Sequence, residues 1–173
     1  MTKYNDNSSN DGKKPVRVLF VCLGNICRSP AAEGVMLHLI EQRGLQGHIE
    51  VDSAGTYGGH AGSLPDQRMR VHARRRGYNL THRSRRVTGR DFEDFDVIVA
   101  MDNSNVINLR DMAATIEEAS KIVPMGKYIR QYPHYDYVPD PYYEGSEGFE
   151  LVLDLLEDAC EALLDDITNR NRQ

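Results

Sequence analysis

The chain has 173 residues, 40% of them hydrophobic and 27% charged, and its net charge at pH 7 is -5. This length is typical of one domain and is sufficient to bury a core without metals or disulfides. No apolar run approaches the roughly 20 residues of a membrane helix, and the polar N-terminus lacks a secretory signal, so we expect a cytoplasmic protein without a membrane partner.

Residues 1–14 are polar and nearly free of apolar groups, which predicts a disordered tail, and we expect residues 15–173 to form a single domain. The apolar, β-branched run at 16–21 predicts a buried strand. Gly24 ends this strand, and Ser29 and Pro30 then begin a helix, with Pro30 expected at its first position. Apolar residues continue at helical spacing to Ile40.

The rest of the chain alternates between the two patterns. We expect strands at 48–51, 96–101 and 121–123, helices at 66–77, 103–112 and 149–167, a turn at 92–95, and a functional loop at 125–147. This alternation predicts an α/β fold, a three-layer sandwich with a four-stranded parallel sheet and helices on both faces. Ligands of such folds bind at the carboxyl ends of the strands, which here is the loop after the first strand.

The three cysteines fit a reducing compartment. An odd, low number argues against a secreted disulfide scaffold. Cys22 and Cys27 lack a second Cys or His pair at zinc-finger spacing, so no structural metal is expected. Cys160 lies in an apolar helix and is expected to contribute packing.

The loop after the first strand has the composition of a phosphate site. Between Cys22 and Arg28 it contains Leu23, Gly24, Asn25, Ile26 and Cys27, and Ser29 follows. Gly24 permits a positive φ, so that successive N–H groups can converge on an anion at the start of a helix. Arg28 adds a planar fork for two phosphate oxygens.

The same positive field would favour a thiolate at Cys22, and Ser29 could donate a hydrogen bond to the sulfur. The alternative interpretation is a buried core cysteine with a surface arginine. The preceding strand, the glycine and the following helix favour the phosphate loop.

The sequence around this loop resembles the low-molecular-weight protein tyrosine phosphatases, because VLFVCLGNICRSPAAEGV is similar to their phosphate-binding loop. Residues 52–56 resemble the second-strand motif of that family, residues 95–102 its central strand, and residues 140–143 its general-acid loop. Together these segments span residues 16–167 in the order of the family.

The resemblance implies hydrolysis of phosphotyrosine in proteins through a phosphocysteine, without metal or cofactor. Cys22 would be the nucleophile, Arg28 and the loop amides would bind the phosphate, and Asp140 would be the general acid. Taken alone, Asp140 could equally be a turn-forming residue before Pro141.

The resemblance also implies roles for residues around the loop. Three aromatic residues would line the substrate pocket: Tyr57, Tyr142 and Tyr143. Four polar residues would support the loop, with Asp102 in a structural role: Asn25, Ser53, His82 and Asp102.

Three other functions compete with this interpretation. Protein-arginine phosphatases share the fold, but usually carry Thr in place of Ile26 and lack the paired tyrosines. A thiol-dependent arsenate reductase would need further cysteines at 77–90, where there are none. A non-catalytic phosphate-binding module would lack the nucleophile or the acid, yet Cys22 and Asp140 are both present.

Two features remain open in the sequence. The arginine-rich stretch at 68–90 could bind nucleic acid, but it lacks the aromatic platforms of single-strand binders, so we favour a solvated surface and expect no nucleic-acid partner. Cys27 could form a disulfide with Cys22 under oxidation, or could be a neighbour without a role. Nothing in the sequence indicates the oligomeric state.

Overall fold

The computed structural model describes residues 12–170. Most of the predicted tail therefore lies outside the described residues, and residues 12–14 contain no helix or strand. The division into a tail and one domain stays a prediction. Within residues 12–170, no helix is long and apolar enough to cross a membrane.

Four parallel strands form the central sheet in the order β2-β1-β3-β4, which confirms the predicted fold class. The strands are β1 (Val16–Cys22), β2 (Ile49–Gly55), β3 (Val97–Ala100) and β4 (Ile122–Pro124). The chain leaves β1 for the edge strand β2 and then returns to the other side of β1 as β3. Such a reversal of strand order opens a crevice at the carboxyl end of the strands.

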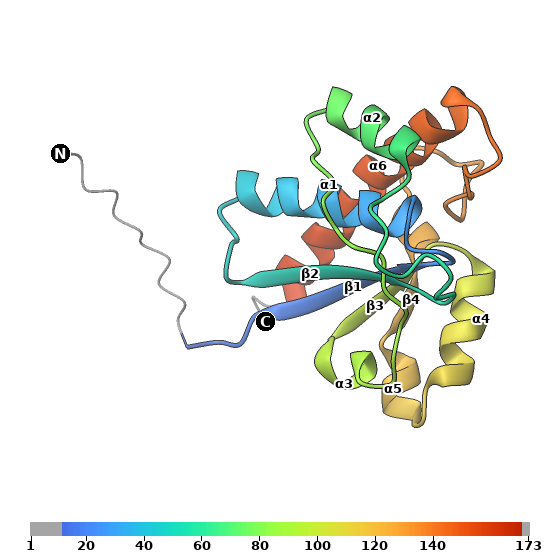
Figure 1. Ribbon diagram of the computed structural model, residues 1–173. Coiled ribbons are helices and arrows are strands. Elements are labelled where there is room, and N and C mark those ends of the chain that lie inside the picture. The colour runs from blue at the N-terminus through green and yellow to red at the C-terminus, as the bar shows by residue number, and fades with distance from the viewer. Residues whose placement is uncertain (1–11, 171–173) are drawn as a thin grey trace.

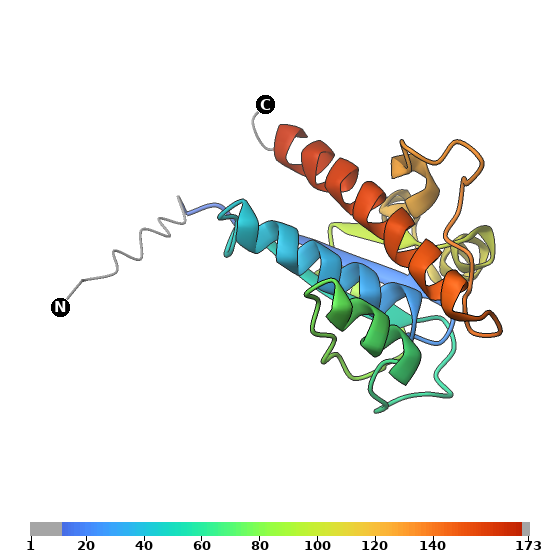
Figure 2. The same ribbon diagram turned by 90° about the horizontal axis from the view of Figure 1, so that it is seen from above.

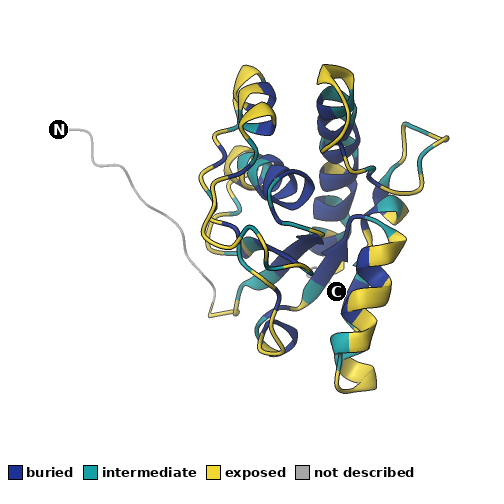
Figure 3. Ribbon diagram, turned by 45° about the vertical axis from the view of Figure 1, so that its right-hand side comes forward, coloured by how far each residue is buried: buried dark blue, intermediate teal, exposed yellow. Residues whose placement is uncertain are grey.

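Helices cover both faces of the sheet (Figures 1 and 2). One layer contains α1 (Arg28–Gln42), α2 (Gln67–Arg75) and α6 (Ser146–Arg170). The other contains α3 (Asp91–Asp94), α4 (Asn103–Met112) and α5 (Ile116–Ser120), and the 3-10 helix η1 (Met125–Tyr128) follows β4. The strands are mostly buried between the layers, and most exposed residues lie on the outer helix faces and loops (Figure 3).

Side chains of β1 alternate between two apolar cores, as the geometry of a strand requires. Phe20 belongs to the larger core under α1 and α6, and Leu19 belongs to the smaller core under α3 and α4. Both side chains are fully buried, and each such burial contributes about 1.5–3 kcal/mol. Because β1 is buried on both faces, the phosphate loop that follows it starts from a rigid position.

Several predicted boundaries were wrong. Helix α1 begins at Arg28, so Pro30 occupies its third position; proline is tolerated there because first-turn N–H groups have no acceptor within the helix. Strand β2 continues past residue 51, because its pairing with β1 extends to Cys22 opposite Gly55. The predicted turn at 92–95 is mostly the short helix α3, and neither α5 nor η1 was predicted.

Candidate active site

The loop between β1 and α1 is held by its carbonyl groups. Four of these carbonyl groups accept hydrogen bonds at 2.7–3.0 Å. The N–H of Thr56 donates to Cys22 and the N–H of Tyr57 to Leu23. The hydroxyl of Ser84 donates to Gly24, and the N–H of Asp66 donates to Ile26. The N–H groups from Leu23 to Cys27 donate to no residue within 12–170. Outward carbonyls and unpaired N–H groups are the arrangement of a backbone anion site at a helix N-terminus.

Asn25, not Gly24, provides the left-handed turn of the loop. Its φ is +56°, and it is the one non-glycine residue of the described chain with a positive φ, whereas the φ of Gly24 is not positive. The sequence prediction was wrong here because asparagine also tolerates this conformation when its side chain is hydrogen-bonded locally. Gly24 has a different role, since a Cβ there would lie 3.0 Å from Cδ2 of His60.

The buried side chain of Asn25 connects the loop to its surroundings. Its Nδ2 donates to Oγ of Ser29 at 2.7 Å and to Oγ of Ser53 at 3.1 Å. Its Oδ1 accepts from the N–H of Arg85 at 3.0 Å and lies 2.9 Å from Nε2 of His82. All hydrogen-bonding atoms of the amide are therefore engaged, which fixes the strained turn.

Gly55, at the end of β2, is a supporting residue that the sequence analysis missed. A Cβ at this position would lie 2.6 Å from the carbonyl oxygen of Leu23 and 3.1 Å from the backbone nitrogen of Asn25. Only glycine allows the loop to pack so closely on β2. The signal in the sequence was the glycine of the second-strand motif, whose partner lies in the phosphate loop.

Cys22 and Cys27 lie in different chemical environments although both are buried and free. Sγ of Cys22 lies 3.0 Å from Oγ of Ser29, which also accepts from Asn25. Since that hydroxyl accepts from Asn25, its single hydrogen can be donated either to a thiolate at Cys22 or to the carbonyl of Ala54, 3.3 Å away. Burial, with Asp66 as a smaller cause, raises the pKa of Cys27, which keeps this second thiol protonated.

Arg28 lies under the pocket with 2% of its side chain exposed. Its Nη1 donates to Oδ2 of Asp102 at 2.6 Å and to the carbonyl of Val138 at 3.0 Å, while Nη2 lies 3.7 Å from Oδ2 of Asp140. Burial opposes the charge of Arg28, but Cys22 and Asp102 outweigh it and raise the pKa of the guanidinium. The buried cation is thus compensated and oriented.

Asp102 joins the phosphate site to the other half of the sheet. Its Oδ1 accepts from the N–H of Asn105, and the amide of Asn105 accepts from the N–H of Asp102, so Asp102 caps α4 at the end of β3. The other carboxylate oxygen receives Arg28. The structural role expected for Asp102 therefore includes the orientation of Arg28.

Residues 138–145, which we call the acid segment, carry Asp140 and are held by few hydrogen bonds. The N–H of Val138 donates to the carbonyl of Met101 at 2.8 Å, and Oδ1 of Asp140 accepts from the N–H of Tyr142 at 3.0 Å. Arg68 donates to the carbonyl of Tyr142 at 3.0 Å, and its guanidinium lies 5.4 Å from the centre of that ring. Asp140 is 42% exposed and faces the pocket from the solvent side.

One cavity brings these groups together. It is lined by Cys22, Leu23, Gly24, Ile26, Cys27, Arg28, Tyr57, His60, Asp140, Tyr142 and Tyr143. The two tyrosines from the acid segment meet edge to face, with ring centres 5.0 Å apart. Five of the predicted site residues are outside the lining: Asn25, Ser29, Ser53, His82 and Asp102. His60 is in the lining but was not predicted.

Behind the loop, Glu33, Asp52 and His82 form a titratable cluster. Nδ1 of His82 lies 3.5 Å from Oε2 of Glu33 and 3.4 Å from Oδ1 of Asp52. Burial, followed by the charge of Asp52, raises the pKa of Glu33 to about 7, while burial lowers the pKa of His82. Three such ligands could hold a metal ion, but Arg85 lies 3.0 Å from Asp52 and already supplies a positive charge.

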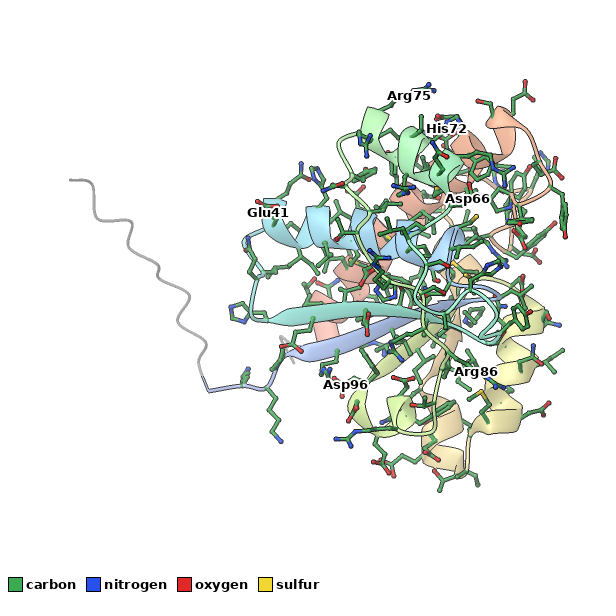
Figure 4. The ribbon with its side chains drawn as sticks, viewed as in Figure 1. Glu41, Asp66, His72, Arg75, Arg86 and Asp96 are labelled. Carbon is green, nitrogen blue, oxygen red and sulfur yellow. The ribbon has the colours of Figure 1, made fainter. Side chains whose placement is uncertain are left out.

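Helix α2 fixes the beginning of α6, which directly follows the acid segment. His72 stacks on Phe149 with ring centres 5.7 Å apart, and its Nδ1 pairs with Glu150 at 2.5 Å. Arg76, one turn further, pairs with Glu150, Asp154 and Glu157. In Figure 4, Asp66 and His72 lie on the side of α2 that faces the start of α6. Sequence reasoning missed these contacts because they join residues about 75 positions apart.

Comparison with known proteins agrees with this geometry. The model of a family described as low molecular weight phosphotyrosine protein phosphatase matches residues 17–173. A putative low molecular weight protein-tyrosine-phosphatase of Synechocystis sp. is 46% identical over 149 residues, which is 86% of this chain and 94% of the relative.

Solved structures of similar proteins share the fold. A protein tyrosine phosphatase from Entamoeba histolytica, with Hepes in its active site, superposes with a TM-score of 0.87 at 44% identity, over 90% of this chain and 99% of that one. A structure described as a drosophila arginine phosphatase superposes with a TM-score of 0.80 at 38% identity, over 87% and 96% of the two chains.

Proposed function

The chain belongs to the low molecular weight phosphotyrosine protein phosphatase family, and we propose that Cys22, Arg28 and Asp140 catalyse its reaction. Membership makes the protein a phosphoric monoester hydrolase that acts on phosphoproteins. The observation that supports these residue roles is the single cavity in which the thiol, the guanidinium and the carboxyl group meet above a backbone anion site.

In the first step, the Cys22 thiolate attacks phosphorus in line with the bond to the leaving phenolate. The S–P bond forms as the P–O bond breaks, and Asp140 gives its proton to the leaving oxygen. The unpaired N–H groups of the loop and Arg28 stabilise the three equatorial oxygens, where charge is concentrated in a loose transition state. The products are a phosphocysteine and a neutral phenol.

In the second step, water attacks the phosphorus of the phosphocysteine, and the Asp140 carboxylate accepts a proton from that water. The S–P bond breaks and inorganic phosphate is released. Ser29, 3.0 Å from the sulfur, donates a hydrogen bond to the departing thiolate. Asp140 then carries the proton again, so the catalytic cycle closes.

The test is hydrolysis of p-nitrophenyl phosphate by the wild type and Cys22→Ser. Loss of the nucleophile should lower kcat by at least about 10³-fold. Mass spectrometry of a rapidly quenched Asp140→Asn reaction should show one phosphate on the Cys22 peptide. Equal rates in wild type and Cys22→Ser, or phosphate on another residue, would exclude the mechanism.

Phosphotyrosine is the substrate that the pocket favours. Ile26 and three tyrosine rings give the cavity an apolar wall that suits an aromatic leaving group. The arginine phosphatase among the structural relatives supports phosphoarginine as a second candidate. Turnover of matched phosphotyrosine and phosphoarginine peptides separates the two, and a higher kcat/KM for the phosphoarginine peptide would reverse our assignment.

All three thiols are free, and a nucleophilic thiol is maintained in a reducing compartment, so we propose that the protein acts in the cytoplasm. Oxidation that joins Cys22 to Cys27 would stop the reaction reversibly.

A further inference from the structure

Arg83 and Arg86 lie beside the pocket and have no acidic partner. Both are exposed, and neither forms an ion pair with any residue within 12–170. Their neighbour Arg85, by contrast, is paired with Asp52 and Asp91. Two unpaired cations at one place on a protein with a net charge of -5 leave a local positive field.

Contacts with the segment 58–62 place these arginines next to the pocket but outside its lining. The aliphatic part of Arg86 packs against Gly58, since its Cδ would be 3.3 Å from a Cβ there, and Gly58 directly follows the lining residue Tyr57. Nη1 of Arg83 donates to the carbonyl of Gly62 at 3.1 Å. We call Arg83 and Arg86 the basic rim; Figure 4 shows Arg86 beside the loops at the carboxyl end of the sheet.

The opposite side of the pocket has the other sign of charge. Asp140, Glu144 and Glu147 line a second cavity on the outer side of the acid segment, and both glutamates are exposed. Arg68 lies nearby, but Asp66 binds it at 3.0 Å and reduces its field. A peptide bound in the cavity therefore lies between a positive and a negative surface.

From this asymmetry we propose that the basic rim selects phosphotyrosine segments that carry Asp or Glu within about three residues of the phosphotyrosine. The proposal rests on the function proposed above and specifies its substrate class. An extended peptide advances about 3.3 Å per residue, so a side chain two or three residues away lies outside the cavity, over its rim. A carboxylate there pairs with Arg83 or Arg86, whereas a lysine is repelled by them.

The experiment compares three phosphotyrosine peptides that differ only in flanking residues: Asp, Asn or Lys at the second and third positions on each side. For the wild type, kcat/KM should fall about 3- to 10-fold from the Asp to the Asn peptide, and further for the Lys peptide, mainly through KM. The difference should shrink in 0.5 M NaCl, because exposed charges are screened.

The double variant Arg83→Gln/Arg86→Gln should hydrolyse all three peptides at similar rates. A matched control is Arg74→Gln/Arg75→Gln, which removes the same charge from exposed positions at the far end of α2 (Figure 4) and should keep the wild-type preference. p-Nitrophenyl phosphate, which has no flanking residues, should be hydrolysed equally by all three proteins.

The outcomes separate this proposal from the function on which it rests. If no phosphotyrosine peptide is hydrolysed, the proposed function fails. If all peptides are hydrolysed but the wild type does not prefer the Asp peptide, or both double variants lose the preference equally, the basic rim is not the selecting surface. If single-stranded DNA inhibits the wild type more strongly than an unphosphorylated Asp-rich peptide, the rim serves a polynucleotide and the proposal is wrong.

Discussion

The phosphate loop and the acid segment form opposite walls of one pocket, but they are held in different ways. In the loop, Cys22, Asn25, Arg28 and Ser29 are at most 3% exposed, and hydrogen bonds to four carbonyl groups fix the backbone from outside. In the acid segment, Tyr143 is 92% exposed, and the carboxylate of Asp140 is nearly half exposed.

The difference corresponds to two tasks of the site. Binding a transferring phosphoryl group requires dipoles and charges that are already oriented, because reorganisation would cost energy during the reaction. Protonating a leaving group requires a carboxyl group near the pocket entrance that leaves room for the substrate to enter. The pocket thus combines a pre-organised anion site with an accessible acid.

Among substitutions in the acid segment, Asp140→Asn should lower the activity most. For phenyl phosphate, whose leaving group needs a proton, we expect kcat to fall about 10²- to 10³-fold. For p-nitrophenyl phosphate, whose leaving group is much less basic, the loss should be clearly smaller. Steady-state kinetics with both esters checks this, and an equal loss for the two would mean that Asp140 does not act as the acid.

Asn25→Ala tests whether the hydrogen bonds of Asn25 hold the phosphate loop in its active conformation. Alanine at φ +56° costs about 1–2 kcal/mol, and loss of the amide leaves the partly buried N–H of Arg85 without an acceptor at about 1–3 kcal/mol. We expect a lower midpoint of urea unfolding and a fall in kcat of about 10- to 100-fold. Asn25→Gly relieves the backbone strain but does not restore the hydrogen bonds, so it should recover more of the stability than of the activity. Full activity in Asn25→Gly would show that the hydrogen bonds of Asn25 do not support catalysis.

Arg68→Met tests how the acid segment is positioned. It removes the hydrogen bond to the carbonyl of Tyr142 but keeps an apolar side chain over Phe149, which the guanidinium now covers at 4.8 Å. We expect kcat/KM to fall about 3- to 10-fold for phenyl phosphate and less for p-nitrophenyl phosphate. Arg75→Met, at an exposed position of the same helix, is the control. An equal effect in both variants would show that Arg68 does not position the acid segment.

Glu150→Gln should have the smallest effect and should depend on pH. Hydrogen bonds from His72 and Arg76 lower the pKa of Glu150 in the folded state, so its ionised form stabilises the fold above about pH 4.5, and this contribution is lost as the pH falls through the folded-state value. Because the side chain is 40% exposed, we expect the variant to lose no more than about 1 kcal/mol at pH 7.

Urea unfolding of both proteins at pH 7 and pH 3.5 measures this difference. Wild type and Glu150→Gln should differ at pH 7, and this difference should narrow at pH 3.5, while Glu147→Gln, at an exposed neighbouring position, should match the wild type at both. A gap at pH 3.5 as large as at pH 7 would contradict the assigned role of Glu150.

The two walls also differ in how far the sequence predicts them. The phosphate loop is a local feature, since one apolar strand, one glycine and one helix start indicate an anion site, although the positive φ belongs to Asn25. Asp140 precedes a proline in a long loop, so local patterns leave its role open and only the family resemblance indicates it. The contacts of Arg28 with Asp102 and Val138 span 74 and 110 residues, and no periodicity predicts them.

Val138 limits the movement of the acid. It is fully buried, its N–H is bound to Met101 and its carbonyl to Arg28, and Asp140 follows only two residues later. Two extended residues span at most about 7 Å, so the Cα atom of Asp140 cannot travel farther than this from its anchor. The acid is therefore a tethered group with a high effective concentration at the pocket, and extra residues inserted between Val138 and Asp140 would dilute it.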